Sequence, residues 1–175
     1  MNEIKIIAVG GAGASIVKNA LDCNMKAPII VIDKDDSLLN ILGIKDADFL
    51  CFRNDTDKNS LIDDLNCRLK DSKILVIVGG GAGEVTSLCV DKIAEIAKSK
   101  TDDVLCFISM PFDFEGIERI ERAASVCKML EEKNIRCYTA SLQSILEKDY
   151  YKTQREMFQA IGKEFLEVIK KEILK

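Results

Sequence analysis

The residues best placed to bind a ligand form two glycine-rich loops, and each loop follows a short apolar run. The first is Gly10-Gly11-Ala12-Gly13-Ala14-Ser15 and the second is Gly79-Gly80-Gly81-Ala82-Gly83-Glu84. Small residues let backbone N–H groups approach an anion, and a helix N-terminus behind the loop adds a favourable field. The first loop alone also fits a tight strand-to-helix turn, but four glycines within five positions of the second exceed what a turn requires. We therefore predict that both loops bind phosphate.

Charged residues near these loops are candidates for binding the rest of a nucleotide. Asp33 follows the second apolar run about 20 residues after the first loop, which is the usual place of a carboxylate that binds ribose hydroxyls. Asp36 or Ser37 equally fits the N-cap of the helix that comes next. Glu115 and Arg119 stand at i and i+4, where the alternative to ribose and phosphate binding is a surface ion pair.

Six short apolar runs alternate with helical patterns along the chain. The runs are rich in Val and Ile, as buried parallel strands are, and cover Glu3–Val9, Ile29–Ile32, Asp48–Phe52, Lys73–Val78, Val104–Ser109 and Ile135–Thr139. Helical patterns cover Ser15–Leu21, Ser37–Leu42, Ser60–Leu69, Val85–Ala97, Gly116–Glu131, Leu142–Glu147 and the long last stretch Thr153–Leu174. The alternation predicts an α/β fold with a doubly wound, mostly parallel six-stranded sheet, Rossmann-like with strand order 3-2-1-4-5-6, that ends in a long C-terminal helix.

This strand order decides where the two glycine loops lie. Ligands of a doubly wound sheet bind outside the carboxyl ends of the strands, at the point where the strand order reverses. The first and fourth strands are neighbours at that point, so both loops are expected to face one crevice. Two loops on one crevice fit a polyphosphate better than either loop alone.

Bulk composition narrows the classes of function. A chain of 175 residues, 47% of them hydrophobic, fits one domain over residues 1–175. The net charge of -4 and the pI near 5.1 argue against a nucleic-acid partner, and no apolar run approaches the roughly 20 residues that cross a membrane. Seven cysteines without CxxC spacing, no histidine and no secretory signal predict a cytoplasmic protein without a metal site.

Together these motifs resemble the GTPase domain of the FtsZ and tubulin superfamily over nearly the whole chain. The most specific of them is Pro111-Phe112-x-Phe114-Glu115-Gly116-x-x-Arg119, while Gly79–Glu84 is similar to the tubulin signature and Ile6–Val17 to the first phosphate loop. The resemblance implies GTP or GDP as the ligand, a prokaryotic protein of cell division or the cytoskeleton, and Phe158 as the residue that stacks on guanine.

The sequence departs from the family pattern at the residues that would contact the nucleotide. The signature hydroxyls are replaced by Ala82 and Glu84, the first-loop Asn is Ser15, and the base-reading position falls on Gly162. A carboxylate 4 Å from a phosphate charge costs about 4 kcal/mol at an effective dielectric constant near 20. Glu84 is therefore expected to point away, to bind through a metal, or to mark a crevice that no longer holds a triphosphate.

The family continues beyond the long helix into an activating loop and a second domain, whereas this sequence stops at Lys175. Self-activated GTP hydrolysis is therefore not expected. The Lys and Glu side chains on one side of the last helix predict that water, and not a second domain, covers that side. We interpret the chain as a nucleotide-binding protein that self-associates or regulates an FtsZ-like filament.

Other interpretations remain. One is a slow GTPase or nucleotide switch that another protein activates, and one is a purely structural module. A Rossmann-type NAD site would use Gly11, Gly13 and Asp33, but its third glycine position falls on Ile16.

Overall fold

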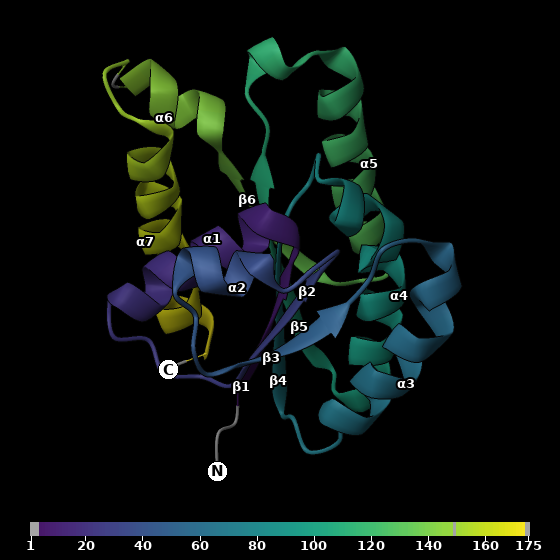
Figure 1. Cartoon of the computed structure of the whole chain (residues 1–175). Coiled ribbons are helices and arrows are strands. Elements are labelled where there is room, and N and C mark those ends of the chain that lie inside the picture. The colour runs from purple at the N-terminus through teal and green to yellow at the C-terminus, as the bar shows by residue number, and fades with distance from the viewer. Residues whose placement is uncertain (1–3, 149, 174–175) are drawn as a thin grey trace.

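The computed structural model describes residues 4–148 and 150–173 and contains one six-stranded sheet in which every strand pair is parallel. The strand order is β3-β2-β1-β4-β5-β6, as the sequence predicts (Figure 1). The strands are β1 (Ile4–Val9), β2 (Ile29–Asp33), β3 (Ala47–Cys51), β4 (Ile74–Gly80), β5 (Asp103–Met110) and β6 (Arg136–Ser141). The predicted ends Glu3 and Leu174 lie outside the described residues.

Helices cover both faces of this sheet. They are α1 (Gly10–Asp22), α2 (Ser37–Leu42), α3 (Lys58–Arg68), α4 (Glu84–Lys100), α5 (Ile117–Glu132), α6 (Leu142–Lys148) and α7 (Gln154–Ile173), with short 3-10 turns η1 (Asp55–Asp57) and η2 (Asp113–Glu115). Helices α3, α4 and α5 pack on one face, and α1, α2, α6 and α7 pack on the other (Figure 1). The doubly wound architecture is thereby confirmed.

The central strand β1 is buried on both faces, which is why its sequence is an unbroken apolar run. Ile7 and Val9 contribute to the core beneath α3, α4 and α5, whereas Ile6 and Ala8 contribute to the core beneath α1 and α7. At the carboxyl end of β1, Val9 is in register with Gly79 of β4. The two glycine segments therefore start side by side.

Helix α1 begins five residues earlier than predicted. The pattern placed its start at Ser15, because glycine is a poor helix former. In the structure the whole first glycine segment forms the opening turn, and a Cβ atom on Gly13 would lie 2.3 Å from the carbonyl oxygen of Val78. The glycine is required there because α1 presses against β4, a tertiary contact that overrides helix propensity.

The N-terminus of α2 also differs from the prediction. Asp36 occupies the N-cap position but makes no side-chain capping bond. Instead, an Asp35 carboxylate oxygen accepts a hydrogen bond from the backbone N–H of Ser37 at 2.9 Å and another from the Ser37 hydroxyl. These two hydrogen bonds hold the pKa of Asp35 below its usual range.

The last helix, α7, packs along α1. A Cβ atom on Gly162 would lie 2.6 Å from the Cβ atom of Asn19, so the two helices touch at this glycine. One turn further, the ring of Phe165 meets that of Phe107 of β5 edge-on, with 5.3 Å between centroids. The opposite side of α7 is exposed and polar, with Gln159, Lys163, Glu164, Glu167, Lys170 and Lys171. None of the described helices is long and apolar enough to cross a membrane.

Candidate nucleotide-binding cavity

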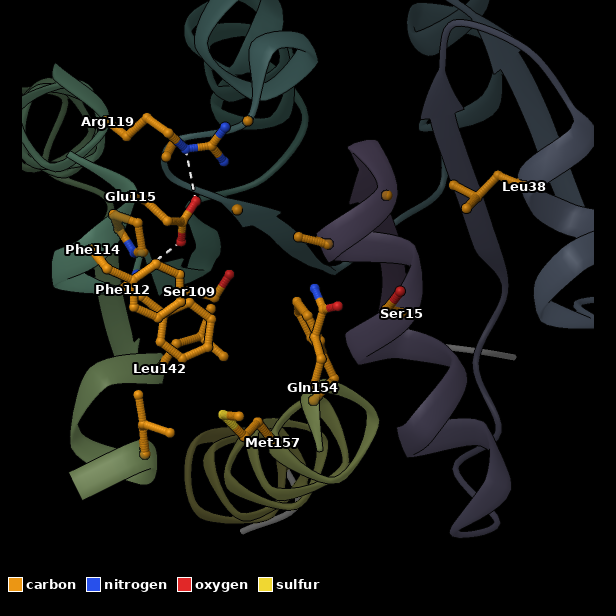
Figure 2. Close-up of a pocket in the computed structure, with 18 residues that line it drawn as sticks. Ser15, Leu38, Ser109, Phe112, Phe114, Glu115, Arg119, Leu142, Gln154 and Met157 are labelled. Carbon is orange, nitrogen blue, oxygen red and sulfur yellow. Dashed lines mark hydrogen bonds and ion pairs between the residues drawn. The ribbon is translucent and has the colours of Figure 1, made fainter. Parts of the chain in front are cut away.

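A cavity of about 740 Å³ opens at the carboxyl edge of the sheet (Figure 2). Its wall is built by the first turn of α1, the β4–α4 loop, the segment around η2, and the starts of α6 and α7. Nine of the predicted site residues line it: Gly11, Ala12, Ser15, Gly80, Ala82, Gly83, Glu115, Arg119 and Phe158. The structure thus brings both glycine segments and the Glu115–Arg119 pair to one cavity.

Two helix N-termini end at this cavity without a side-chain cap. The N-cap residue of α1 is Val9 and that of α4 is Gly83, and neither accepts a backbone N–H through its side chain. The first N–H groups of a helix have no intrahelical acceptor, and the helix dipole makes their surroundings favourable for negative charge. This end of the cavity can therefore hold an anion such as a phosphate.

The second glycine segment keeps its shape through its own backbone. Gly81 N–H donates to the carbonyl of Ser109 at 2.9 Å, and Gly83 N–H donates to the carbonyl of Gly80 at 2.9 Å. The Thr86 hydroxyl of α4 donates to the Val9 carbonyl at 3.3 Å and ties this segment to the end of β1. These hydrogen bonds hold the two glycine segments in a defined position relative to each other.

Seven of the predicted site residues do not line the cavity: Gly10, Gly13, Ala14, Asp33, Gly79, Gly81 and Glu84. Several of these glycines are needed because neighbouring elements pack too closely on them to leave room for a side chain. A Cβ atom on Gly81 would lie 2.8 Å from the Cβ atom of Ala123, so this glycine lets α5 approach the sheet. A Cβ atom on Gly79 would lie 3.1 Å from the side chain of Thr86. Gly10 adopts a φ of +70°, which favours glycine for conformational reasons.

The carboxylates of Asp33 and Glu84 also lie outside the cavity wall. Asp33 accepts the backbone N–H of Lys34 at 2.7 Å, and its partial burial raises its pKa. Glu84 pairs with the ammonium group of Lys34 at 2.7 Å, and this hydrogen bond lowers the pKa of Glu84. Among the alternatives for Glu84, the structure shows a side chain that points to a lysine outside the wall.

Glu115 makes two contacts. One oxygen accepts the Phe112 backbone N–H at 2.8 Å and closes the η2 turn, while the other receives Arg119 Nε at 2.7 Å. The predicted i, i+4 ion pair is therefore present. Figure 2 shows the remaining guanidinium nitrogens of Arg119 directed away from Glu115. Arg119 keeps free donors for an anionic ligand because only Nε is used in this pair.

The other end of the cavity is apolar, and sequence reasoning missed most of it. Phe112 and Phe114 stack with 4.8 Å between ring centroids, and the other apolar lining residues include Leu142, Leu146, Met157 and Phe158. Gln154, in the first turn of α7, is the one amide of the lining (Figure 2). The apolar stripe of the last helix indicates that one face of it is buried in the core. No local pattern in the sequence predicts that the first turn of this helix lines a cavity.

Gly162, the position that the resemblance assigns to base reading, does not line the cavity. It is buried against Asn19 of α1, as its close contact there requires. A longer side chain at this position would collide with α1 and would not reach a ligand. Recognition of a base by residue 162 is therefore excluded by packing in this chain.

Comparison with family models found no match, and comparison with curated protein sequences found none either. Solved structures do match. An FtsZ dimer of M. jannaschii has a TM-score of 0.78 at 16% identity over 97% of this chain, and Clostridium botulinum phage c-st TubZ has 0.78 at 15% over 97%. CetZ2 of Haloferax volcanii, as a GTPγS-bound protofilament, has 0.78 at 13% over 95%.

The chain has the fold of the FtsZ and tubulin superfamily, as its motifs predict. It spans 54%, 59% and 57%, respectively, of the lengths of these three proteins. At such low sequence identity the likeness defines the architecture, and the ligand has to be argued from the cavity itself.

Proposed function

We propose that this chain binds a nucleoside diphosphate or triphosphate, GTP or GDP by likeness, in the cavity at the carboxyl edge of the sheet. The observation that carries the proposal is the meeting of two uncapped helix N-termini at one end of a cavity whose other end is apolar. Such a cavity matches a ligand with an anionic end and a flat hydrophobic end. Two of the similar structures are described as a GTPγS-bound CetZ2 protofilament and a GDP-bound CetZ1 monomer.

The described residues assign parts of a nucleotide to parts of the wall. The backbone N–H groups of Gly11, Ala12 and Gly83 would hold the phosphates, and Arg119 would add a cation beside them. Phe158 and Met157 would contact the base. This distribution follows from charge and polarity alone, because the N–H donors lie at one end and the apolar side chains at the other.

Hydrolysis by this chain alone is not part of the proposal. Glu115 is the one carboxylate in the lining that the structure describes, and one of its oxygens accepts the Phe112 N–H while the other is paired with Arg119. A general base needs a free acceptor within hydrogen-bond reach of the attacking water. We therefore propose a binding protein whose nucleotide turnover, where it occurs, depends on another subunit.

Gly11 offers a matched pair of variants that test phosphate binding. A Cβ atom at Gly11 meets no other atom within 4 Å, and the residue lines the cavity, so a side chain fits there without disturbing the core. Gly11→Asp adds a negative charge beside the phosphates, and Gly11→Asn adds nearly the same volume without charge. An acidic residue in the first turn of a helix also favours folding.

Calorimetric titration is expected to show that the original chain binds GDP and that Gly11→Asn binds it more weakly. Gly11→Asp is expected to lose at least a further tenfold in GDP affinity, because like charges repel in a partly closed site. Equal affinity of the Asp and Asn variants would show that phosphate does not lie at α1. Absence of any binding by the unchanged chain would overturn the proposed function.

We further propose that the rim of the cavity contacts a second subunit of this fold, in self-association or on an FtsZ-like filament. Phe114 lines the cavity and is 74% exposed, and three more large apolar side chains are exposed in the segments that join lining residues: Ile117 (67%), Tyr150 (72%) and Tyr151 (97%). We call these four residues the apolar rim. In the chain, Ile117 lies between the lining residues Glu115 and Arg119, and both tyrosines lie between the lining residues Leu146 and Gln154. Exposed apolar clusters with a polar surround are typical of protein contacts.

A further inference from the structure

Ser109, near the end of β5, is a buried polar residue in the wall of the proposed nucleotide site. It is 4% exposed, and no other lining residue that the structure describes is both polar and buried. Its backbone is held in place, because Gly81 N–H donates to its carbonyl at 2.9 Å. The Ser109 hydroxyl makes no hydrogen bond to any described residue, and Figure 2 shows it directed into the cavity. This hydroxyl is therefore open to a ligand.

A buried hydroxyl without a partner is rare in a folded protein, because its lost hydration is not recovered. The other two buried polar side chains of the described residues differ from Ser109. The Thr86 hydroxyl donates to the Val9 carbonyl at 3.3 Å. The Ser72 oxygen is covered by protein and does not line this cavity. Of these three hydroxyls, only that of Ser109 can gain its partner from a ligand in the cavity.

The strand order places Ser109 between the two ends of the cavity. The helix starts proposed to bind phosphate follow the neighbouring strands β1 and β4, and β5 pairs with the other side of β4. Ser109 is in register with Gly80, a lining residue of the second glycine segment. Leu142 and Leu146 of the apolar end follow β6, one strand further. Because the sugar of a nucleotide joins its phosphates to its base, a nucleotide that spans these two ends brings its sugar to Ser109.

Glu115, which sequence reasoning assigns to the ribose, is already engaged. One of its oxygens accepts the Phe112 backbone N–H at 2.8 Å, and the other is paired with Arg119 Nε at 2.7 Å. The Ser109 hydroxyl has no competing partner among the described residues. A hydroxyl can both donate to and accept from a sugar hydroxyl, so Ser109 fits this role without breaking an existing contact.

We propose that Ser109 binds a ribose hydroxyl of the nucleotide, and that the cavity therefore prefers ribonucleotides to deoxyribonucleotides. The inference rests on the proposed function, because the sugar reaches Ser109 only when the phosphates lie at the starts of α1 and α4. A deoxyribose would cover the serine hydroxyl without giving it a partner. A site that forms a hydrogen bond with a ligand hydroxyl discriminates against the analogue that lacks it.

Calorimetric titration of the full chain with GDP, 2′-deoxy-GDP and 3′-deoxy-GDP tests this contact. Both deoxy forms are needed because the ribose has a hydroxyl at each position. We expect one of them to bind about five- to tenfold more weakly than GDP, the usual effect of one hydrogen bond. Ser109→Ala removes only the hydroxyl oxygen. It should weaken GDP binding by a similar factor and bring the three affinities within about twofold of one another.

Ser125→Ala is the matched control, because it makes the same change at an exposed serine of α5 that does not line the cavity. It should leave all three affinities unchanged. Equal affinity of the unchanged chain for GDP and both deoxy forms would overturn the ribose contact and leave the nucleotide site standing. A preference for GDP that persists in Ser109→Ala would overturn the role of Ser109. Absence of binding of all three ligands by the unchanged chain would overturn the proposed function itself.

Discussion

At the scale of single residues, the most informative side chain is Glu84. It stands in the first turn of α4, beside N–H groups that favour an anion, yet it carries a charge that would repel phosphate. Its carboxylate lies against the ammonium group of Lys34, 2.7 Å away, and this pairing keeps the pKa of Glu84 low. The pair bridges the loops after β2 and β4 and thereby neutralises the charge that the sequence places next to the glycine segment.

Neutralising Glu84 is expected to strengthen nucleotide binding. In Glu84→Gln the negative charge is lost and Lys34 becomes available to the phosphates. Because the pair is exposed to solvent, the gain in GDP affinity should stay within about fivefold and shrink as salt is raised. Isothermal titration at two ionic strengths measures both effects.

Glu95→Gln is the matched control for this change. Glu95 lies on the same helix and is also paired with lysines, Lys92 and Lys133, but it is remote from the cavity lining. Its loss should leave GDP affinity unchanged. A weaker affinity in Glu84→Gln would contradict the account, because it would mean that the carboxylate takes part in binding.

At the scale of elements, the contact between α1 and α7 shapes the apolar end of the cavity. The two helices approach until a Cβ atom at Gly162 would lie 2.6 Å from that of Asn19, and this approach positions Met157 and Phe158 at the cavity wall. Both helices also contribute to one buried core, through Ile16 and Val17 of α1 and Ile161 and Phe165 of α7. The packing of α7 on α1 that forms this core therefore also forms part of the cavity wall.

Gly162→Ala is expected to destabilise the fold by about 1–3 kcal/mol, because an added methyl group in a packed interface forces the helices apart. Asn19→Gly removes the opposing Cβ atom and should offset part of this cost. A double-mutant cycle from urea unfolding should give a coupling energy of about 1 kcal/mol. The exposed substitution Gln159→Ala should change stability by less than about 0.5 kcal/mol. Additive effects of the two glycine-contact substitutions would contradict the packing described.

The strands and helices could be predicted largely from local patterns, whereas half of the cavity could not. Buried parallel strands such as β1 could be predicted because both of their faces are apolar. The glycine segments could be predicted because so many glycines in a short stretch are rare. The start of α1 at Gly10 and the packing glycine Gly81 depend on distant partners, Val78 and Ala123. Gln154 and Met157 reach the cavity only through the packing of α7 on α1, which no local pattern encodes.

At the scale of the whole molecule, the functional features gather on one edge. Both glycine segments follow the carboxyl ends of strands, β1 and β4, and the cavity is lined by residues of these segments and of the segments that contain the apolar rim. The solved structures with this fold include an FtsZ dimer and a CetZ2 protofilament. The expectation that water covers the polar side of α7 and that residues 1–175 act as one domain stays a prediction.

The apolar rim predicts association through this edge. Light scattering or sedimentation of the chain, alone and with an FtsZ-like protein from the same source, should reveal a complex. The double variant Phe114→Ser, Ile117→Ser should weaken this complex by about tenfold, because two apolar side chains are no longer buried in the contact. Leu88→Ser, at an exposed apolar residue of α4, is the control. An association that the rim substitutions leave unchanged would place the contact elsewhere.

The measurement that tests the central claim most directly is the chemical-shift change of backbone amides when GDP is added to the isotope-labelled chain. If the phosphates lie at the two helix N-termini, the largest changes will fall on Gly11, Ala12, Ala82 and Gly83, while the turn residues Gly43 and Asn134 stay unchanged. The changes should saturate at one nucleotide per chain. Saturable changes confined to other surfaces, or none at all, would contradict the site proposed here.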